Sequence, residues 1–375
     1  MRYLLPCFVV LLAACEGGSN SGGTYHQDNP HLPPALSTAP QNTGDGWTTS
    51  TPAAEGLDEA ELRLALTSIR DGSYPKVDAL LVARHGRLVA EGYFNGFGPD
   101  ALHDLRSAGK SFVSALAGIA IDQGLFGVDD RISALIPGFE QHEHMDAAKE
   151  SITVRDLLNM DSGLDCNDWN GSASPGWEES MYASHDWIGF MLDLPMANTP
   201  GTAPAYCTGG VVLLSHIIAV RSGRGIDDFA NTWLFGPLGI HDVIWRKSPD
   251  GQASGGAAGM QLRPRDLAKL GQLYLDGGTW NGARVEPQAW VTESQRRAVS
   301  LGNDGYGFLW WKRTFPGPNG PVEAFFANGN GGNYVFVLPA LDMVVAYAGS
   351  NYNSDLSNQP YYSLANDVLT AVTAP

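Results

Sequence analysis

The chain has 375 residues, 43% of them hydrophobic, which is ample material for a large buried core. Its formal net charge is -17, from 23 basic and 40 acidic side chains. This balance argues against nucleic acid as a partner, because phosphate backbones attract basic surfaces. The length allows two domains, or one enzyme-sized domain of about 300 residues with a subdomain.

Residues 1–15 resemble a bacterial lipoprotein signal peptide. Arg2 precedes an apolar run, Leu4 to Ala14, that is too short to span a bilayer as a mature helix. The run ends in a sequence similar to a lipobox, in which Cys15 would be acylated and become the first mature residue. We expect an extracytoplasmic protein whose only membrane contact is this anchor, in the periplasm or outer membrane if the host is Gram-negative. An ordinary signal peptide cut nearby is the alternative.

Residues 16–50 are rich in Gly, Ser, Asn, Thr and Pro and nearly lack aliphatic side chains. Such a composition predicts a flexible linker. We therefore expect one folded domain over residues 51–375, with a mostly helical subdomain at roughly 125–280.

The folded part begins with signals for a helix and a hairpin. Asp58 with Glu61 three residues later forms a capping-box pattern, and the apolar residues that follow support a helix. Two apolar runs at 77–84 and 87–94 are joined by His85-Gly86, which predicts a β-hairpin.

The middle of the chain, roughly 105–280, carries mostly helical patterns and loops, and strands return near the end. The expected late elements are strands at 306–312, 323–328, 334–339 and 343–349 and a closing helix at 363–372. Strands at both ends with helices between them predict an α+β fold, in which helices flank an antiparallel sheet built from both ends of the domain. A parallel doubly wound sheet is excluded, because regular strand–helix alternation is missing.

The segment Leu105 to Val113 carries the pattern Ser-x-x-Lys at Ser107 and Lys110. Ser107 is placed to open a helix, so a lysine one turn later can reach its hydroxyl, and burial would make the amine a usable base. A second match, at Ser73 and Lys76, contains a proline and cannot present both groups on one helical face. A simple N-cap serine with a solvated lysine is the alternative for Ser107.

This segment resembles the first motif of the serine beta-lactamase and penicillin-binding-protein family, nearest to class C beta-lactamase-related esterases and 6-aminohexanoate-dimer hydrolases. The resemblance implies the beta-lactamase/transpeptidase-like fold. It runs from about Leu57 to the C-terminus and includes further segments at 153–158, 161–164, 200–206, 265–267, 306–311 and 329–332.

The family's second motif, Tyr-x-Asn, reads Tyr206-Cys207-Thr208 in this chain. The resemblance implies that Tyr206 lies beside the nucleophile and relays a proton to the leaving group. Thr208 replaces the usual asparagine and is expected to contact substrate with its hydroxyl. An ordinary core tyrosine is the alternative for Tyr206.

The third motif, normally Lys-Thr-Gly or His-Thr-Gly on an edge strand, is absent, and the corresponding region is Gly-rich. Small residues would let substrate approach the strand backbone, so Asn330, Gly331, Gly332 and Asn333 are candidates for substrate and oxyanion binding. A Gly-rich hairpin turn is the alternative. In beta-lactamases the missing lysine attracts the drug's carboxylate, so its absence disfavours strong beta-lactamase activity.

Cys166 and Cys207 remain as an even pair once Cys7 leaves with the signal peptide and Cys15 is lipid-bound. In an oxidising compartment they are expected to form a disulfide that pins their loop to the active site, with two free buried thiols as the alternative. The aromatic-rich stretch 167–200 fits either a substrate-facing flap or a loop with its own small core.

The expected function is a serine hydrolase that acts on small esters or amides through an acyl-enzyme, with no metal and no organic cofactor. The alternatives are a non-hydrolysing penicillin-binding or sensing module, and a weak class C-type beta-lactamase or D-aminopeptidase. A His- and Glu-containing run at 142–146 is interpreted as solvated surface and not as a metal site. The Gly-x-Ser-x-Gly elbow of α/β-hydrolases does not occur.

Overall fold

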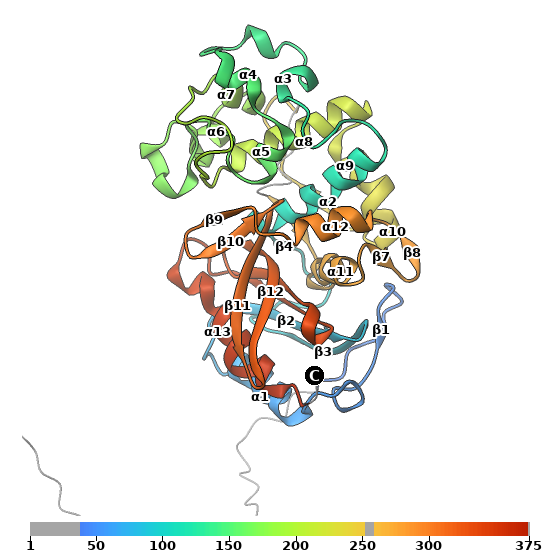
Figure 1. Ribbon diagram of the computed structural model, residues 1–375. Helices are drawn as coiled ribbons and strands as arrows, with labels where there is room; N and C mark the ends of the chain where they lie inside the picture. Colours follow the sequence, from blue (N-terminus) through green and yellow to red (C-terminus); the bar gives the residue numbers. More distant parts are fainter. Residues whose placement is uncertain (1–37, 252–258, 374–375) are drawn as a thin grey trace, which may run out of the picture. The chain divides into compact units, whose positions relative to one another are not determined.

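The computed structural model describes residues 38–251 and 259–373 (Figure 1). The expected signal peptide, its Cys15 anchor and residues 16–37 of the expected linker lie outside this part of the chain. Among the helices of the described residues, none has the length and apolar character needed to cross a membrane.

A nine-stranded sheet forms the centre of the domain, in the order β1-β3-β2-β14-β13-β12-β11-β10-β9. Its strands are β1 (Thr48–Thr49), β2 (Val77–Arg84), β3 (Arg87–Tyr93), β9 (Val299–Leu301), β10 (Asp304–Gly307), β11 (Trp310–Gly317), β12 (Gly320–Gly329), β13 (Asn333–Leu338) and β14 (Met343–Gly349). Neighbours pair antiparallel, except for the parallel edge pair β1–β3. The expected sheet from both chain ends is confirmed, because β2 pairs with β14.

The helices of the described residues surround this sheet and build a second, mostly helical part. They are α1 (Glu59–Arg70), α2 (Gly109–Asp122), α3 (Ile132–Leu135), α4 (Ala147–Ser151), α5 (Val154–Leu158), α6 (Glu178–Ala183), α7 (Trp187–Leu192), α8 (Thr208–Ser222), α9 (Ile226–Ala230), α10 (Gly236–Leu238), α11 (Pro264–Leu275), α12 (Gln288–Ser294) and α13 (Gln359–Ser363). Short strands β4 (His103–Asp104), β5 (Ile244–Trp245) and β6 (Met260–Leu262) form a small second sheet, and β7 (Thr279–Trp280) pairs with β8 (Ala283–Arg284).

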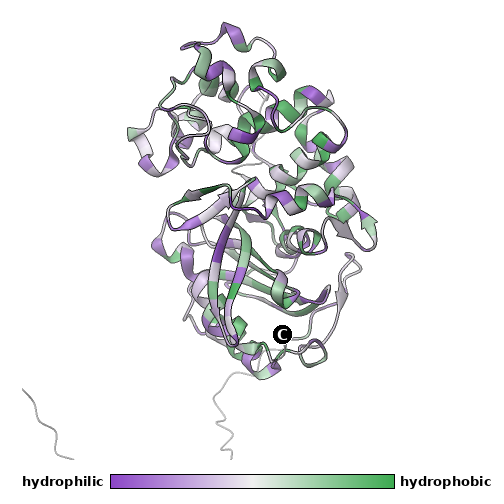
Figure 2. Cartoon of the chain, viewed as in Figure 1, coloured by the Kyte–Doolittle hydropathy of each residue, from purple (hydrophilic) through white to green (hydrophobic). Residues whose placement is uncertain are grey.

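Helices cover both faces of the large sheet, which is why its central strands are apolar on both sides. Gly271 of α11 lies so close to β13 and β14 that an added Cβ would be 2.5 Å from Val335 and 2.7 Å from Val344. Tyr361 of α13 packs against Phe336 on the opposite face of β13. Figure 2 shows hydrophobic residues in the strands and helices, and hydrophilic residues on the loops, on the outer helices and along β11.

Two expected boundaries need correction. The helical subdomain was expected to extend to about residue 280, but α11 packs on the large sheet, so the helical part ends before Pro264. The expected strand at 306–312 is two strands, β10 and β11, because Phe308 and Leu309 both adopt positive φ angles, of 50° and 65°, between them.

The expected linker also ends too late, because residues 38–50 pack on the domain. Trp47 is buried in the core, and the buried guanidinium of Arg265 donates to Asp45 at 3.1 Å and to Thr43 at 2.7 Å. The same guanidinium donates to Glu91 at 2.9 Å. The segment has few aliphatic residues, so a composition argument could not detect that its polar groups satisfy a distant buried charge.

The N-terminal elements match their patterns closely. Helix α1 begins after Asp58, whose side chain accepts from the backbone N–H groups of Ala60 and Glu61. The hairpin of β2 and β3 turns at His85-Gly86 as expected. The closing helix differs from its prediction, because α13 already begins at Gln359.

Candidate active site

Ser107 lies in a short 3-10 turn, Arg106–Ala108, that leads directly into α2. Arg106 has a left-handed backbone with a φ of 49°, a conformation that costs a residue with a side chain about 1–3 kcal/mol. Asp104 supports this conformation by accepting from the Arg106 N–H at 3.0 Å. The turn places Ser107 at the edge of a cavity, one turn before Lys110.

Lys110 donates to the Ser107 hydroxyl, with a distance of 2.7 Å between Nζ and Oγ. The lysine side chain comes from the first turn of α2 and is only 1% exposed. Burial lowers the pKa of Lys110 to about 8, although the negative charges of Glu178 and Asp168 act in the opposite direction. An amine with a pKa near 8 exists partly as the free base at neutral pH and can accept a proton from a serine hydroxyl.

Tyr206 joins this pair from the segment before α8. The Nζ atom of Lys110 lies 5.0 Å from the centre of the Tyr206 ring. Burial raises the pKa of Tyr206 well above its ordinary value, and a hydrogen bond with Ser107 acts against this rise. The phenol is therefore neutral at physiological pH and can donate a proton. The structure brings together all three side chains that we expected at the catalytic centre.

The Tyr206 ring packs against two tryptophan rings, whose own centres lie 6.3 Å apart. Its centre is 5.4 Å from that of Trp169, at an interplanar angle of 5°, and 5.6 Å from that of Trp311. Trp169 is 55% exposed and lines the cavity. Trp187 is buried and packs against Tyr182. The stretch 167–200 thus combines the two alternatives. Trp169 faces the site, as in a substrate-facing flap, whereas Trp187 and Tyr182 belong to a small core of the loop.

The disulfide expected between Cys166 and Cys207 is present, with Cα atoms 5.4 Å apart. It joins the loop before Trp169 to the start of α8. One consequence is that Asp168 reaches the helix start, where its carboxylate accepts from the Thr208 N–H at 2.7 Å.

Thr208 does not have the position that we expected for a substrate contact. Its side chain is fully buried and is not part of the cavity wall. Asp168 and Glu178 line the cavity instead, and the Asp168 carboxylate also accepts from the Glu178 N–H at 3.0 Å. Burial, followed by the charge of Glu178, raises the pKa of Asp168. The sequence could have pointed to Asp168, because it lies two residues after Cys166. Cys166 is bonded to Cys207, which belongs to the second motif.

The backbone of β12 approaches the nucleophile at Gly329. A Cβ on this residue would be 1.9 Å from the Leu105 carbonyl oxygen and 3.0 Å from the Ala108 nitrogen, so only glycine fits. Its neighbours Asn328 and Asn330 line the cavity.

The Gly-rich turn after Asn330 holds the strand end in place. The Gly332 N–H donates to the Gly329 carbonyl at 3.3 Å, and the Gly331 carbonyl accepts from Asn351. Asn333 is fully buried and donates to the Asn330 carbonyl at 3.1 Å. Gly331, Gly332 and Asn333, which we expected to bind substrate, do not line the cavity and make contacts within the turn. Asn330 alone of the four lines the cavity.

The model of the beta-lactamase family, described as "Beta-lactamase", matches residues 76–366. The chain belongs to this family. Among curated proteins, it is 27% identical over 227 residues to the 6-aminohexanoate-dimer hydrolase of Paenarthrobacter ureafaciens, covering 57% of this chain and 56% of that enzyme. The chain thus spans a little over half the length of that relative. It is also 27% identical over 316 residues to penicillin-binding protein 4 of Amycolatopsis lactamdurans, covering 74% and 80% of the two chains.

Solved structures share the beta-lactamase fold at low sequence identity. A Bacillus anthracis protein described as a 6-aminohexanoate-dimer hydrolase aligns with a TM-score of 0.68 at 20% identity, covering 88% of this chain and 89% of that one. EstCE1, described as a hydrolase with promiscuous acyltransferase activity, aligns with a TM-score of 0.66 at 16% identity, covering 82% and 99%. These identities support the shared fold and leave the substrate open.

The cavity of this beta-lactamase-family protein has a volume of about 520 Å³ and carries mostly negative charge. Among the described residues that line it, Arg313 is the one with a cationic side chain, beside the carboxylates of Asp168, Glu178 and Asp304. The Arg313 guanidinium makes two hydrogen bonds to Asp304, of 2.5 Å and 2.9 Å, and lies 4.4 Å from the centre of the Tyr361 ring. Its charge is therefore largely compensated before any substrate binds.

Residues 38–251 and 259–373 contain no group of three or more His, Cys, Asp or Glu side chains that could hold a metal ion. In the polar run at 142–146, His142 pairs with Asp193 at 2.9 Å. The groups gathered around Ser107 can support acyl transfer with a lysine as base and a phenol as proton donor.

Proposed function

We propose that this protein is a serine hydrolase that cleaves small esters or amides through an acyl-enzyme on Ser107. The observation that carries the proposal is the 2.7 Å contact between Ser107 Oγ and the buried amine of Lys110. An ordinary surface lysine stays protonated at neutral pH, whereas burial lowers the pKa of Lys110 to about 8.

In the acylation step, Ser107 Oγ attacks the carbonyl carbon of the substrate while its proton passes to the Lys110 amine. The resulting oxyanion would be stabilised by the backbone N–H of Ser107 and by that of Asn330 at the end of β12. Tyr206 then gives its hydroxyl proton to the leaving alcohol or amine and regains a proton from Lys110. The carbonyl reforms, and the acyl group remains as an ester on Ser107.

In the deacylation step, a water molecule attacks this ester. The water proton passes to the Lys110 amine, and Lys110 returns it to Ser107 Oγ as the ester C–O bond breaks, so the acid product leaves and the Ser107 hydroxyl is restored. No redox step or cofactor is required by this sequence of proton transfers.

The negative charge of the cavity favours the binding of esters and amides that carry no carboxylate near the reacting carbonyl. Asn328 lies near the strand end where the family's third motif has a cation, and Arg313 is bound by Asp304. A beta-lactam carboxylate would therefore meet Asp168 and Glu178 without a cation at the position of the third-motif lysine. The names of the relatives, which include a 6-aminohexanoate-dimer hydrolase and a penicillin-binding protein, agree with an amide or ester as substrate.

A fluorophosphonate probe tests the nucleophile. We expect labelling at Ser107, and we expect Ser107→Ala to remove both labelling and hydrolysis of short-chain p-nitrophenyl esters. Ser73→Ala, in the second Ser-x-x-Lys match, is the control and should behave as wild type. Full activity in Ser107→Ala would refute the proposal, and one turnover followed by a stable adduct would indicate a binding or sensing module.

A comparison of substrates tests the charge argument. We expect p-nitrophenyl esters to turn over faster than nitrocefin, with D-amino-acid amides as a third arm. Efficient nitrocefin hydrolysis with inert esters would reverse this order.

We also propose that Cys15 carries a lipid anchor, on the basis of the N-terminal sequence alone. Radiolabelled palmitate should be incorporated by the wild type and not by Cys15→Ala. Unchanged detergent partitioning of Cys15→Ala would contradict the proposal.

A further inference from the structure

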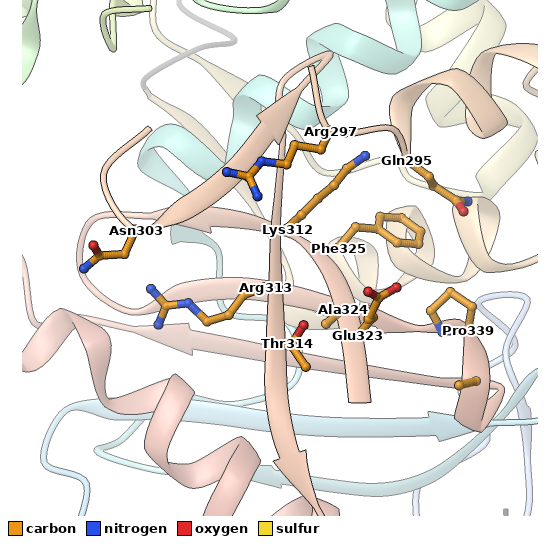
Figure 3. A pocket seen from close by; sticks show the side chains of 12 residues that line it. Gln295, Arg297, Asn303, Lys312, Arg313, Thr314, Glu323, Ala324, Phe325 and Pro339 are labelled. Atoms are coloured by element: carbon orange, nitrogen blue, oxygen red, sulfur yellow. The ribbon is translucent and has the colours of Figure 1, made fainter. Parts of the chain in front are cut away.

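A second cavity, of about 730 Å³, lies beside strands β10, β11 and β12 (Figure 3). Residues of the segment after α12 and of the turn after β13 complete its wall. Asn303 and Arg313 belong to the walls of both cavities, so a single strand layer separates this space from the catalytic one.

Side chains alternate between the two faces of β11, so the neighbours Trp311 and Lys312 point to different cavities. Trp311 contributes to the catalytic cavity, and the next residue, Lys312, contributes to the second one. Lys312 is paired across the sheet with Gly305 on one side and with Phe325 on the other.

Within the described part of the chain, the ammonium group of Lys312 makes no ion pair. Its Nζ atom is buried and has no hydrogen-bond partner among residues 38–251 and 259–373. Burial lowers the pKa of Lys312 to about 8, and the more distant carboxylates of Glu293 and Glu323 only partly oppose this shift. An uncompensated buried charge costs stability, and a bound anion would offset that cost.

Arg297 adds a second cation to the wall of this cavity, and its guanidinium points away from the Lys312 amine (Figure 3). It donates to the Ser300 hydroxyl and makes no ion pair within the described part of the chain. Gly305 makes room for it, because a Cβ there would be 3.1 Å from Arg297 Cδ and 3.3 Å from Lys312 Cβ. The absent side chain at Gly305 lets the stems of both cations pack side by side across the strand.

The charge of the cavity differs from that of the protein as a whole. Its wall has Arg297 and Lys312 without carboxylate partners, against the single carboxylate of Glu323. The complete chain has a net charge of -17, so a site with uncompensated positive charge is unusual on this molecule.

We propose that this cavity binds a small oxyanion, a carboxylate or a phosphate, between Lys312 and Arg297. An oxyanion accepts charge-assisted hydrogen bonds from both cations and compensates the buried ammonium. Gln295 and Thr314, also in the wall, provide uncharged polar groups for further contacts. The site is separate from the Ser107 centre and does not depend on the proposed hydrolase activity.

Thermal unfolding and isothermal titration with sodium phosphate and with sodium acetate, each at an ionic strength matched with sodium chloride, test this site. We expect at least one of the two oxyanions to raise the Tm of the wild type in a saturable way. Lys312→Gln and Arg297→Gln should each weaken its affinity about tenfold or more, the usual scale for losing a charge-assisted hydrogen bond.

Arg296→Gln is the matched control. The Arg296 side chain is 72% exposed and pairs with Glu293 at 3.1 Å, so its loss removes one nearby positive charge without touching the cavity. This variant should keep wild-type affinity. An affinity loss equal to that of Lys312→Gln would show a general charge effect and overturn the proposal, as would the absence of any oxyanion-specific shift.

Lys312→Met separates a binding role from a structural one. Methionine fills similar space without a buried charge, so we expect a higher Tm than wild type in chloride buffer and no response to the oxyanion. A structural lysine would give a lower Tm in the same buffer. The Ser107→Ala protein should respond to the oxyanion as the wild type does, which keeps this result independent of catalysis.

Discussion

Gly329 of β12 lies against the turn that carries the nucleophile, where a Cβ would approach the Leu105 carbonyl oxygen to 1.9 Å. This contact fixes the distance between the strand end and Ser107. The two elements are more than 200 residues apart in the sequence, so the contact exists only in the folded domain.

Gly329→Ala should therefore separate β12 from the nucleophile turn. We expect ester turnover to fall about 10²- to 10³-fold, the scale of losing an oxyanion donor, because the Asn330 N–H moves with the strand. Gly98→Ala is the control, since a Cβ there meets no atom within 4 Å. Steady-state kinetics with p-nitrophenyl acetate check the prediction, and wild-type turnover in Gly329→Ala would contradict it.

The pH dependence of the reaction should report Lys110. The free amine is the active form, so kcat/KM should rise with pH through an apparent pKa of about 8. Lys110→Ala should be at least about 10²-fold slower. In this variant, kcat/KM should no longer rise with pH through the pKa of the lysine. A wild-type profile that is flat between pH 6 and 9 would argue against a lysine base.

Tyr206→Phe keeps the ring that stacks on Trp169 and on Trp311 and removes only the hydroxyl. We expect kcat to fall while the Tm stays close to wild type, because the stacking is unchanged. The loss should be larger for amides than for p-nitrophenyl esters, whose leaving group needs no proton. Equal losses for both substrates would show that Tyr206 acts in another way.

The Cys166–Cys207 disulfide closes a loop with a sequence separation of 41 residues. By the loop-entropy relation its removal should lower the free energy of unfolding by about 4 kcal/mol. Chemical denaturation of the Cys166→Ala/Cys207→Ala protein measures the change. Alkylation of both thiols in natively secreted wild-type protein would show that the bond does not form.

Asp161 should make stability depend on pH. Its carboxyl is buried, and burial, followed by the charge of Asp156, raises its pKa to about 7 from an ordinary value of 3.8. Between these values the folded protein holds a proton that the unfolded chain has released, so the free energy of unfolding falls as pH rises from about 4 to 7. Asp161→Asn should remove this contribution, and the stability difference between variant and wild type should grow in favour of the variant across that window. A constant difference from pH 4 to 8 would contradict the assignment.

Much of the catalytic centre could be predicted because it depends on local geometry. Ser107 and Lys110 lie one helical turn apart, and a turn fixes their distance whatever the rest of the chain does. The α1 cap and the hairpin of β2 and β3 are local in the same sense.

Other parts of the site depend on contacts between distant segments and could not be read from a pattern. Asp168 reaches the cavity because a disulfide joins its loop to α8, and Gly329 is the close-approach glycine because of the position of β12 against Leu105. A run of several glycines predicts that one of them is needed for close approach, but it does not say which. The charge of Lys312 is unusual only because the fold buries its ammonium group.

The contacts of Arg265 determine where the domain can be cut. A protein shortened to begin at residue 51, the boundary that composition suggests, would lose the Asp45 and Thr43 acceptors and would leave a buried guanidinium with Glu91 as its remaining carboxylate partner. It would also expose the space that Trp47 fills. When the folded domain is prepared alone, the N-terminal boundary should therefore lie before Thr38, and a failure of shorter versions to fold would be a consequence of the chosen boundary.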